Sequence, residues 1–206
     1  MVDGSGSTAV RYALLTDCTC PAHALAASRN FLCSEDVDVI HRLATELPAD
    51  RYITVIDLGA GAGTTALAVM EKRAARVMII SVDTDTAALN WAGLAVKNVG
   101  RSKDWHAIPL SAEATAEWYK GEPPALLLHD AGHTRAAIDR DLRAWLPKLP
   151  AGTPVWVHDY GVAPDASKIP GETYPGVTRA VDRLVRDGLL VRDGVTGWGW
   201  YGRCAT

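Results

Sequence analysis

Histidine and aspartate stand side by side at two places where an apolar run ends. His129-Asp130 follows the run Ala-Leu-Leu-Leu, His158-Asp159 follows Val-Trp-Val, and His133 comes three residues after Asp130. If both runs are neighbouring parallel strands, their ends lie about 4.8 Å apart. Carboxylate oxygens and histidine nitrogens at that spacing can bind one divalent cation. Asp130, Asp159 and His158 are therefore candidate metal ligands; without a cation, one carboxylate would tend to hold a proton.

Three alternating glycines follow an earlier apolar run, within residues 52–63. Gly59, Gly61 and Gly63 allow the main chain to turn sharply and to approach a ligand more closely than a Cβ atom would permit. A second apolar run ends at Asp83, where an acid can accept hydrogen bonds from two ribose hydroxyls. This pattern indicates a nucleoside-binding site.

The glycine spacing favours a ligand without a pyrophosphate. The dinucleotide pattern is G-x-G-x-x-G, whereas here Thr64 occupies the position of its last glycine. Asp57 stands two residues before the first glycine, where its charge repels a pyrophosphate and attracts a cation. A ligand with an ammonium and a sulfonium group suits this loop.

This stretch resembles the first motif of the class I S-adenosylmethionine-dependent methyltransferases, whose loop wraps the amino acid part of the cofactor. A later block is similar to one branch of that class, which includes proteins like macrocin O-methyltransferase and the cephalosporin hydroxylase-type proteins. The block reads His-Asp-x-Gly-His at 129–133, Asp-x-Asp-Leu-x-x-Trp-Leu-Pro-x-Leu at 139–149, His-Asp-Tyr at 158–160 and Tyr-Pro-Gly-Val-x-x-Ala-Val at 174–181. The resemblance implies that S-adenosylmethionine is the cofactor, bound by Asp57, Gly59, Ala60, Gly61, Gly63, Thr64, Asp83, Thr84, Ser111, Ala112 and Asp130.

The resemblance also implies a chemistry, which is O-methylation of a small-molecule hydroxyl. In related metal-dependent enzymes, an acid after the fourth strand and an acidic pair after the fifth bind magnesium, and Asp130 and Asp159 match those positions. His158 stands where the pair's other member is often Asp or Asn, and a histidine favours softer ions or no ion. The hypothesis has Asp130, Asp159 and His158 position the acceptor oxygen, directly or through Mg²⁺ or another divalent cation. His133 then removes its proton, a task that suits a histidine at neutral pH.

Each of these polar residues also has a structural explanation. His129 and His158 can be packing residues, His133 a helix N-terminal cap, and Ser111 the cap of the helix after the third strand. For His129 the packing explanation is preferred, because neighbouring strand residues point to opposite faces.

Alternating apolar runs and amphipathic stretches predict a single α/β unit. A Rossmann-like, doubly wound, mostly parallel seven-stranded sheet is expected, closed by an antiparallel C-terminal hairpin joined at Asp193-Gly194. Trp91 and Trp105 are expected in the core, with a wall of the adenine site as the alternative. Residues 1–50 are interpreted as a tail and helical cap, and 51–206 as the methyltransferase domain. The expected strands are 52–58, 76–82, 105–110, 124–130, 153–159, 188–193 and 197–203, and the expected helices are 64–72, 86–99, 135–146, 175–186 and one that opens at 34–36.

Composition limits the partners. The chain has 206 residues, of which 48% are hydrophobic, so it can bury a substantial core. A formal charge of −3 provides no basic footprint for nucleic acid. No apolar run is long enough to cross a bilayer, and no secretion signal is expected at the N-terminus. A cytoplasmic enzyme with a small-molecule substrate fits these features, and a homo-oligomer is compatible with them.

Two further segments have open interpretations. Cys18, Cys20, His23 and Cys33 offer four potential zinc ligands, although C-x-C lacks the usual C-x-x-C geometry. Reduced thiols in a cytosolic chain explain the same residues more simply. The segment 161–176 is long enough to serve as a substrate lid.

Two alternative functions remain open. One is an S-adenosylmethionine-binding protein without methyl transfer, because a fold does not determine its function. The other is a nicotinamide-dependent oxidoreductase, against which Thr64 argues.

Overall fold

A seven-stranded sheet forms the centre of the computed structural model, which describes residues 20–29, 32–73, 75–161 and 175–205. The strands are β1 (Ile53–Leu58), β2 (Val77–Val82), β3 (Trp105–Ile108), β4 (Leu126–His129), β5 (Pro154–Val157), β6 (Leu190–Thr196) and β7 (Gly199–Cys204). Their order in the sheet is β3-β2-β1-β4-β5-β7-β6. The first five run parallel, and β7 pairs antiparallel with both β5 and β6. The sequence-based prediction of the fold class is therefore confirmed.

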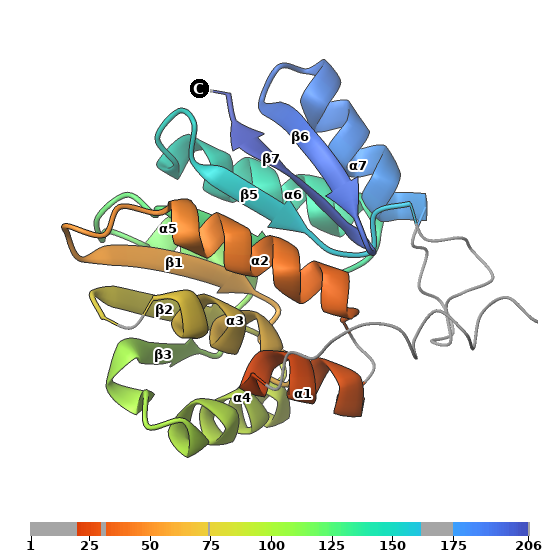
Figure 1. Ribbon diagram of the computed structural model, residues 1–206. Coiled ribbons are helices and arrows are strands. Elements are labelled where there is room, and N and C mark those ends of the chain that lie inside the picture. The colour runs from red at the N-terminus through yellow and green to blue at the C-terminus, as the bar shows by residue number, and fades with distance from the viewer. Residues whose placement is uncertain (1–19, 30–31, 74, 162–174, 206) are drawn as a thin grey trace, which may run out of the picture.

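Helices cover both faces of the sheet (Figure 1). One face carries α1 (Pro21–Arg29), α2 (Ser34–Glu46), α3 (Thr64–Lys72) and α4 (Thr86–Asn98), and the other carries α5 (Ala112–Trp118), α6 (Arg135–Trp145) and α7 (Pro175–Arg186). Two short 3₁₀ helices are η2 (Ser102–Asp104) and η3 (Leu146–Lys148). Val55 packs in the core under α1 to α3, while its neighbour Ile56 packs in the core under α5 to α7. Both faces of β1 are buried, as expected for a central parallel strand.

The C-terminal hairpin is present, but its turn lies elsewhere than the sequence suggests. The turn is at Gly197 and Trp198, between β6 and β7, and Gly197 has a φ of 62°. Asp193 and Gly194 lie inside β6, at a register shift that marks a β-bulge. A Cβ atom on Gly194 would stand 2.3 Å from the Tyr201 hydroxyl, so a larger residue there would have to displace the Tyr201 side chain. The expected Asp-Gly turn was therefore wrong.

The prediction that Trp91 belongs to the core was also wrong. Its side chain is 53% exposed on α4. The buried stripe of this helix is formed by Leu89, Ala92 and Val96, at the spacing of one helix face. Trp91 falls outside that stripe. Trp105 is half-buried, and its indole nitrogen donates to the Ser81 hydroxyl at 2.8 Å.

Two segments that the sequence singled out lie outside the described residues. They are Cys18 and the 162–174 part of the expected lid. Among the helices that the structure does describe, none combines the length and the hydropathy that a membrane span requires.

Candidate active site

A cavity of about 370 Å³ opens at the carboxyl ends of the central parallel strands. Ligands of open α/β sheets bind beyond these strand ends. The cavity brings together six residues that the sequence assigned to the cofactor, from the ends of four different strands: Gly59, Asp83, Thr84, Ser111, Ala112 and Asp130.

The glycine loop lies beside this cavity and is packed against main chain. Gly59 has a φ of 90°, and a Cβ atom there would stand 2.1 Å from the Asp130 carbonyl oxygen. Gly63 has a φ of 88°, and its Cβ atom would meet Cα of Ala92 at 2.9 Å. A Cβ atom on Gly61 would meet nothing within 4 Å, so space remains over the tip of the loop. Two glycines therefore serve packing, and the third faces open space.

Asp83 is held in place by the glycine loop. One carboxylate oxygen accepts from the Ala60 amide at 3.0 Å, and the other accepts from the Asp85 amide at 2.9 Å. Asp85 in turn caps α4 by accepting from the Ala87 amide, as expected for a strand-to-helix connection. Because a carboxylate oxygen can accept more than one hydrogen bond, Asp83 can also accept from a diol in the cavity.

Asp57 lies beneath the loop rather than in the cavity. Its side chain is fully buried and accepts hydrogen bonds from the hydroxyls of Thr65, at 2.8 Å, and Ser81, at 2.7 Å. Burial raises its pKa to about 7, although these two hydrogen bonds act in the opposite direction. The carboxylate thus joins the start of α3 to β2, and it has no surface with which to touch a cofactor.

The raised pKa of Asp57 predicts a pH-dependent stability. Because the folded state holds the proton more tightly than the unfolded state, the free energy of unfolding falls as pH rises from about 4 to about 7. A shift from 3.8 to about 7 corresponds to roughly 4 kcal/mol. In Asp57→Asn the part of this fall that Asp57 causes should be absent, which leaves the smaller fall due to the raised pKa of His158. In Asp50→Asn, which changes an exposed acid, the whole fall should persist. Urea unfolding at pH 5 and pH 8 checks this, and parallel pH profiles for Asp57→Asn and the wild type would contradict it.

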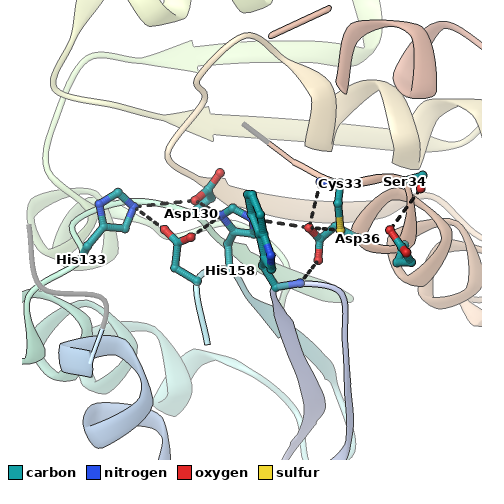
Figure 2. A network of polar contacts seen from close by, with 9 residues as sticks. Cys33, Ser34, Asp36, Asp130, His133 and His158 are labelled. Carbon is teal, nitrogen blue, oxygen red and sulfur yellow. Dashed lines mark hydrogen bonds and ion pairs between the residues drawn. The ribbon is translucent and has the colours of Figure 1, made fainter. Parts of the chain in front are cut away.

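Beside the cavity, two histidines and two aspartates form a connected polar cluster (Figure 2). His133 Nε2 lies 3.1 Å from Asp159 Oδ2 and 3.9 Å from Asp130 Oδ1. His158 Nδ1 lies 2.9 Å from the same Asp130 oxygen. Asp159 has a φ of 59°, a left-handed conformation that a non-glycine residue rarely adopts and that recurs at functional sites.

The charges in this cluster stabilise one another. Burial alone would raise the pKa of Asp130, but His158 and His133 outweigh it and hold that pKa well below its ordinary value. Burial likewise disfavours charge on His158, yet Asp130, Asp36 and Asp159 raise its pKa well above the ordinary value. His158 is therefore an imidazolium at neutral pH, and Asp130 is a carboxylate.

Asp36 completes the network, and sequence reasoning missed this role. The residue was interpreted only as part of a helix start, yet it is fully buried, and its Oδ2 lies 3.4 Å from His158 Nε2. Its carboxylate also accepts from the main-chain amides of Cys33 and Trp198, each at 3.1 Å. Figure 2 shows Asp36 on the opposite side of His158 from His133. Asp36 belongs to the first turn of α2, and α2 and α6 cover opposite faces of the sheet. An acid this far away in the sequence gives no local signal of such a contact.

The structural explanations for the other histidines can now be compared with their surroundings. His129 is buried, with Nε2 3.4 Å from Asp141 Oδ2, so the preferred packing explanation is confirmed. Thr134, not His133, caps α6 by accepting from the Ala137 amide. Ser111 does cap α5, by accepting from the Ala114 amide, and it lines the cavity as well.

The remaining cofactor candidates belong to the loop and do not line the cavity: Ala60, Gly61, Gly63 and Thr64. Seven cavity residues were not assigned to the cofactor from the sequence, namely Val82, Leu110, Ala131, Gly132, Ala137, Arg140 and Asp141. Leu110 is apolar and exposed, and it lies two residues after β3. From there its side chain can pack against a flat ring of a ligand in the cavity.

Comparisons with known proteins bear on the fold. Residues 56–160 match a family model described as a methyltransferase domain. No match is found among curated proteins.

Solved structures share the fold at low sequence identity. The O-methyltransferase TomG from Streptomyces achromogenes, involved in tomaymycin synthesis and solved with S-adenosylmethionine, is 13% identical, with a TM-score of 0.68 over 94% of this chain and 93% of that one. An O-methyltransferase from Bacillus cereus, solved with S-adenosylhomocysteine, is 11% identical, with a TM-score of 0.65 over 96% and 95%. A protein from Corynebacterium glutamicum is 15% identical, with a TM-score of 0.68 over 98% and 93%.

Proposed function

The chain belongs to the methyltransferase domain family, and from this premise we propose that it transfers the methyl group of S-adenosylmethionine to a hydroxyl oxygen of a small molecule. The observation that carries the proposal is the position of the histidine and aspartate cluster. It adjoins the cavity beside the glycine loop, and Asp130 belongs to both. The reacting groups and the nucleoside site thus meet at one strand end.

The cavity suits a nucleoside that carries no phosphate. Asp83 offers carboxylate oxygens for ribose hydroxyls, and Leu110 and Ala112 offer apolar surface for a base. Asp83 and Asp130 both line it, which disfavours a pyrophosphate and favours a cationic ligand. These features support S-adenosylmethionine over a nicotinamide dinucleotide. When bound, it supplies a methyl group made electrophilic by a sulfonium.

His133 is the proposed base. His133 Nε2 lies 3.1 Å from Asp159 Oδ2, so in the neutral ring Nε2 carries the proton and donates to that oxygen. The other ring nitrogen, Nδ1, is then free of a proton and can act as the base. Proton transfer from the acceptor hydroxyl makes His133 an imidazolium, which Asp159 and Asp130 stabilise. With S-adenosylmethionine bound, the deprotonated oxygen would take the methyl group, the carbon–sulfur bond would break, and its electron pair would stay on sulfur. Alignment of the two reactants provides much of the remaining rate gain.

His158 decides between a metal-assisted and a metal-free mechanism. Asp130, His158 and Asp159 each have a potential ligand atom, and these atoms lie within 4.8 Å of one another. A histidine must be neutral to bind a metal, but both ring nitrogens of His158 face carboxylates, at 2.9 Å and 3.4 Å. These three side chains therefore do not form a suitable set of ligands for a metal ion. The imidazolium of His158 already provides a positive charge between the carboxylates of Asp36 and Asp130. We therefore propose O-methylation without a resident metal.

Metal independence is directly testable. After treatment with EDTA, kcat/KM for methyl transfer should be the same with and without added Mg²⁺. Radiolabelled S-adenosylmethionine and a panel of phenols and sugars provide the assay, because the macrocin-like block at 129–181 supports a hydroxylated natural product as acceptor. Activity that Mg²⁺ restores after EDTA treatment would contradict the metal-free mechanism.

A cofactor-binding protein without transfer activity is the second candidate. Calorimetry with S-adenosylmethionine and NAD establishes which cofactor binds, and the acceptor panel establishes transfer. Binding of S-adenosylmethionine with no methylated product across the panel would favour the second candidate. Tighter binding of NAD would contradict both.

A further inference from the structure

A second cluster of potential metal-binding side chains lies where the helices α1, α2 and α3 meet. Cys20, His23 and His41 each offer one ligand atom, and these atoms lie within 4.8 Å of one another. Cys20 immediately precedes α1, His23 lies in α1, and His41 lies in α2. We propose that this cluster is a structural zinc site.

The geometry of the cluster matches the chemistry of zinc. One thiolate and two imidazoles form a sulfur and nitrogen donor set that selects zinc over magnesium or calcium. Cys20 Sγ and His23 Nδ1 are only 2.8 Å apart, and the rings of His23 and His41 meet edge to face with centroids 5.3 Å apart. The side chains of His23 and His41 are almost fully buried, and Cys20 is partly buried. The donor atoms therefore converge in a space from which water is largely excluded.

Glu71 on α3 supplies the carboxylate that the site requires. Its Oε2 lies 2.7 Å from His41 Nε2, and its Oε1 accepts from the Ala22 amide at 2.7 Å. Together with the Cys20 thiolate it would balance the two positive charges of zinc, the thiol proton being released to solvent on binding. Carboxylates in this position either complete the tetrahedron or orient a ligand histidine. In both cases its removal weakens the site.

The other ring nitrogen of His23, Nε2, faces a carboxylate and gives a second observation. The buried Nε2 of His23 has no hydrogen-bond partner among the described residues; Asp38 Oδ1 stands 3.2 Å away, without hydrogen-bond geometry. A buried polar atom left in this way costs free energy unless something compensates it. A metal ion bound at Nδ1 of His23 would orient the ring and strengthen the attraction between its Nε2–H and Asp38.

The site corrects the zinc hypothesis drawn from the sequence. Cys33 is not part of it, because its thiol donates to the Asp36 carboxylate at 3.0 Å. His41 and Glu71, which come later in the chain, take part instead. The consequence is structural. Zinc here would fasten α1 and α2 to α3, the helix that begins at the glycine loop.

Cobalt substitution of the full-length protein tests the proposal. One equivalent of Co²⁺ should produce a thiolate-to-cobalt charge-transfer band and the visible bands of a tetrahedral site. The band should disappear in Cys20→Ser and persist in Cys33→Ser, the matched cysteine control. Glu71→Gln should weaken cobalt binding about 10- to 100-fold. A band that persists in Cys20→Ser, or disappears in Cys33→Ser, would overturn the assignment.

X-ray absorption on zinc-loaded wild-type protein does not depend on any variant folding. We expect one sulfur at about 2.3 Å and nitrogen or oxygen ligands at about 2.0–2.2 Å. Two or more sulfurs, no sulfur, or failure to retain zinc on gel filtration would each reject the site. Since neither measurement involves methyl transfer, the result is independent of the proposed enzymatic function.

Discussion

Replacing His133 with glutamine lowers kcat by about 10²- to 10⁴-fold, the usual contribution of a positioned general base. Glutamine keeps the size and a hydrogen-bond donor to Asp159, but it cannot take a proton. Affinity for S-adenosylmethionine should be unchanged, because His133 does not line the nucleoside cavity. Steady-state kinetics and calorimetry on the same preparation measure the two quantities.

The matched control is His106→Gln, which changes an exposed histidine on β3. Its kcat should equal that of the wild type. If His133→Gln retained wild-type kcat, the base would have to be another group. If it lost cofactor affinity instead, His133 would be a binding residue.

Replacing Gly59 with alanine should be among the most damaging single changes outside the catalytic cluster. A left-handed φ costs an alanine about 1–2 kcal/mol, and the new Cβ atom would stand 2.1 Å from the Asp130 carbonyl oxygen. Because main-chain atoms cannot move aside without a large cost, the free energy of unfolding should fall by about 2–5 kcal/mol in total. Because Gly59 and Asp130 are both cavity walls, affinity for S-adenosylhomocysteine should fall with stability. Urea unfolding and calorimetry measure the two effects.

Gly100→Ala is the matched control for backbone conformation. Gly100 also has a positive φ, of 73°, but a Cβ atom there would meet nothing within 4 Å. Its loss of stability should be limited to the conformational cost, with normal cofactor affinity. Equal behaviour of the two variants would show that the contact between Gly59 and the main chain of Asp130 is unimportant.

The fold was largely predictable because hydrophobic periodicity and turn chemistry are local properties. Helix α3 begins at Thr64 and α7 ends at Arg186, as the sequence predicts. The hairpin turn was not predictable in the same way. Asp193-Gly194 is a typical turn signal, but Gly194 leaves room for the Tyr201 ring, which only tertiary structure brings over it.

The candidate site was predictable only in part, for a similar reason. Residues at the ends of parallel strands must gather at one edge of the sheet, so Asp83, Asp130 and Asp159 could be found from order and spacing. Asp36 could not, because α2 precedes the sheet and its contact with His158 depends on how that helix packs. Asp57 differs from the prediction in another way. It lies at the end of the first strand, as expected, but its side chain is buried and binds Thr65 instead of a cofactor.

The most direct test of the central claim is a crystal structure of the protein with S-adenosylhomocysteine. The account predicts a ribose whose two hydroxyls are hydrogen-bonded to Asp83, an adenine between Leu110 and Ala112, and a sulfur that faces His133 and Asp159. Density for the nucleoside anywhere else, or a sulfur directed away from His133, would contradict it.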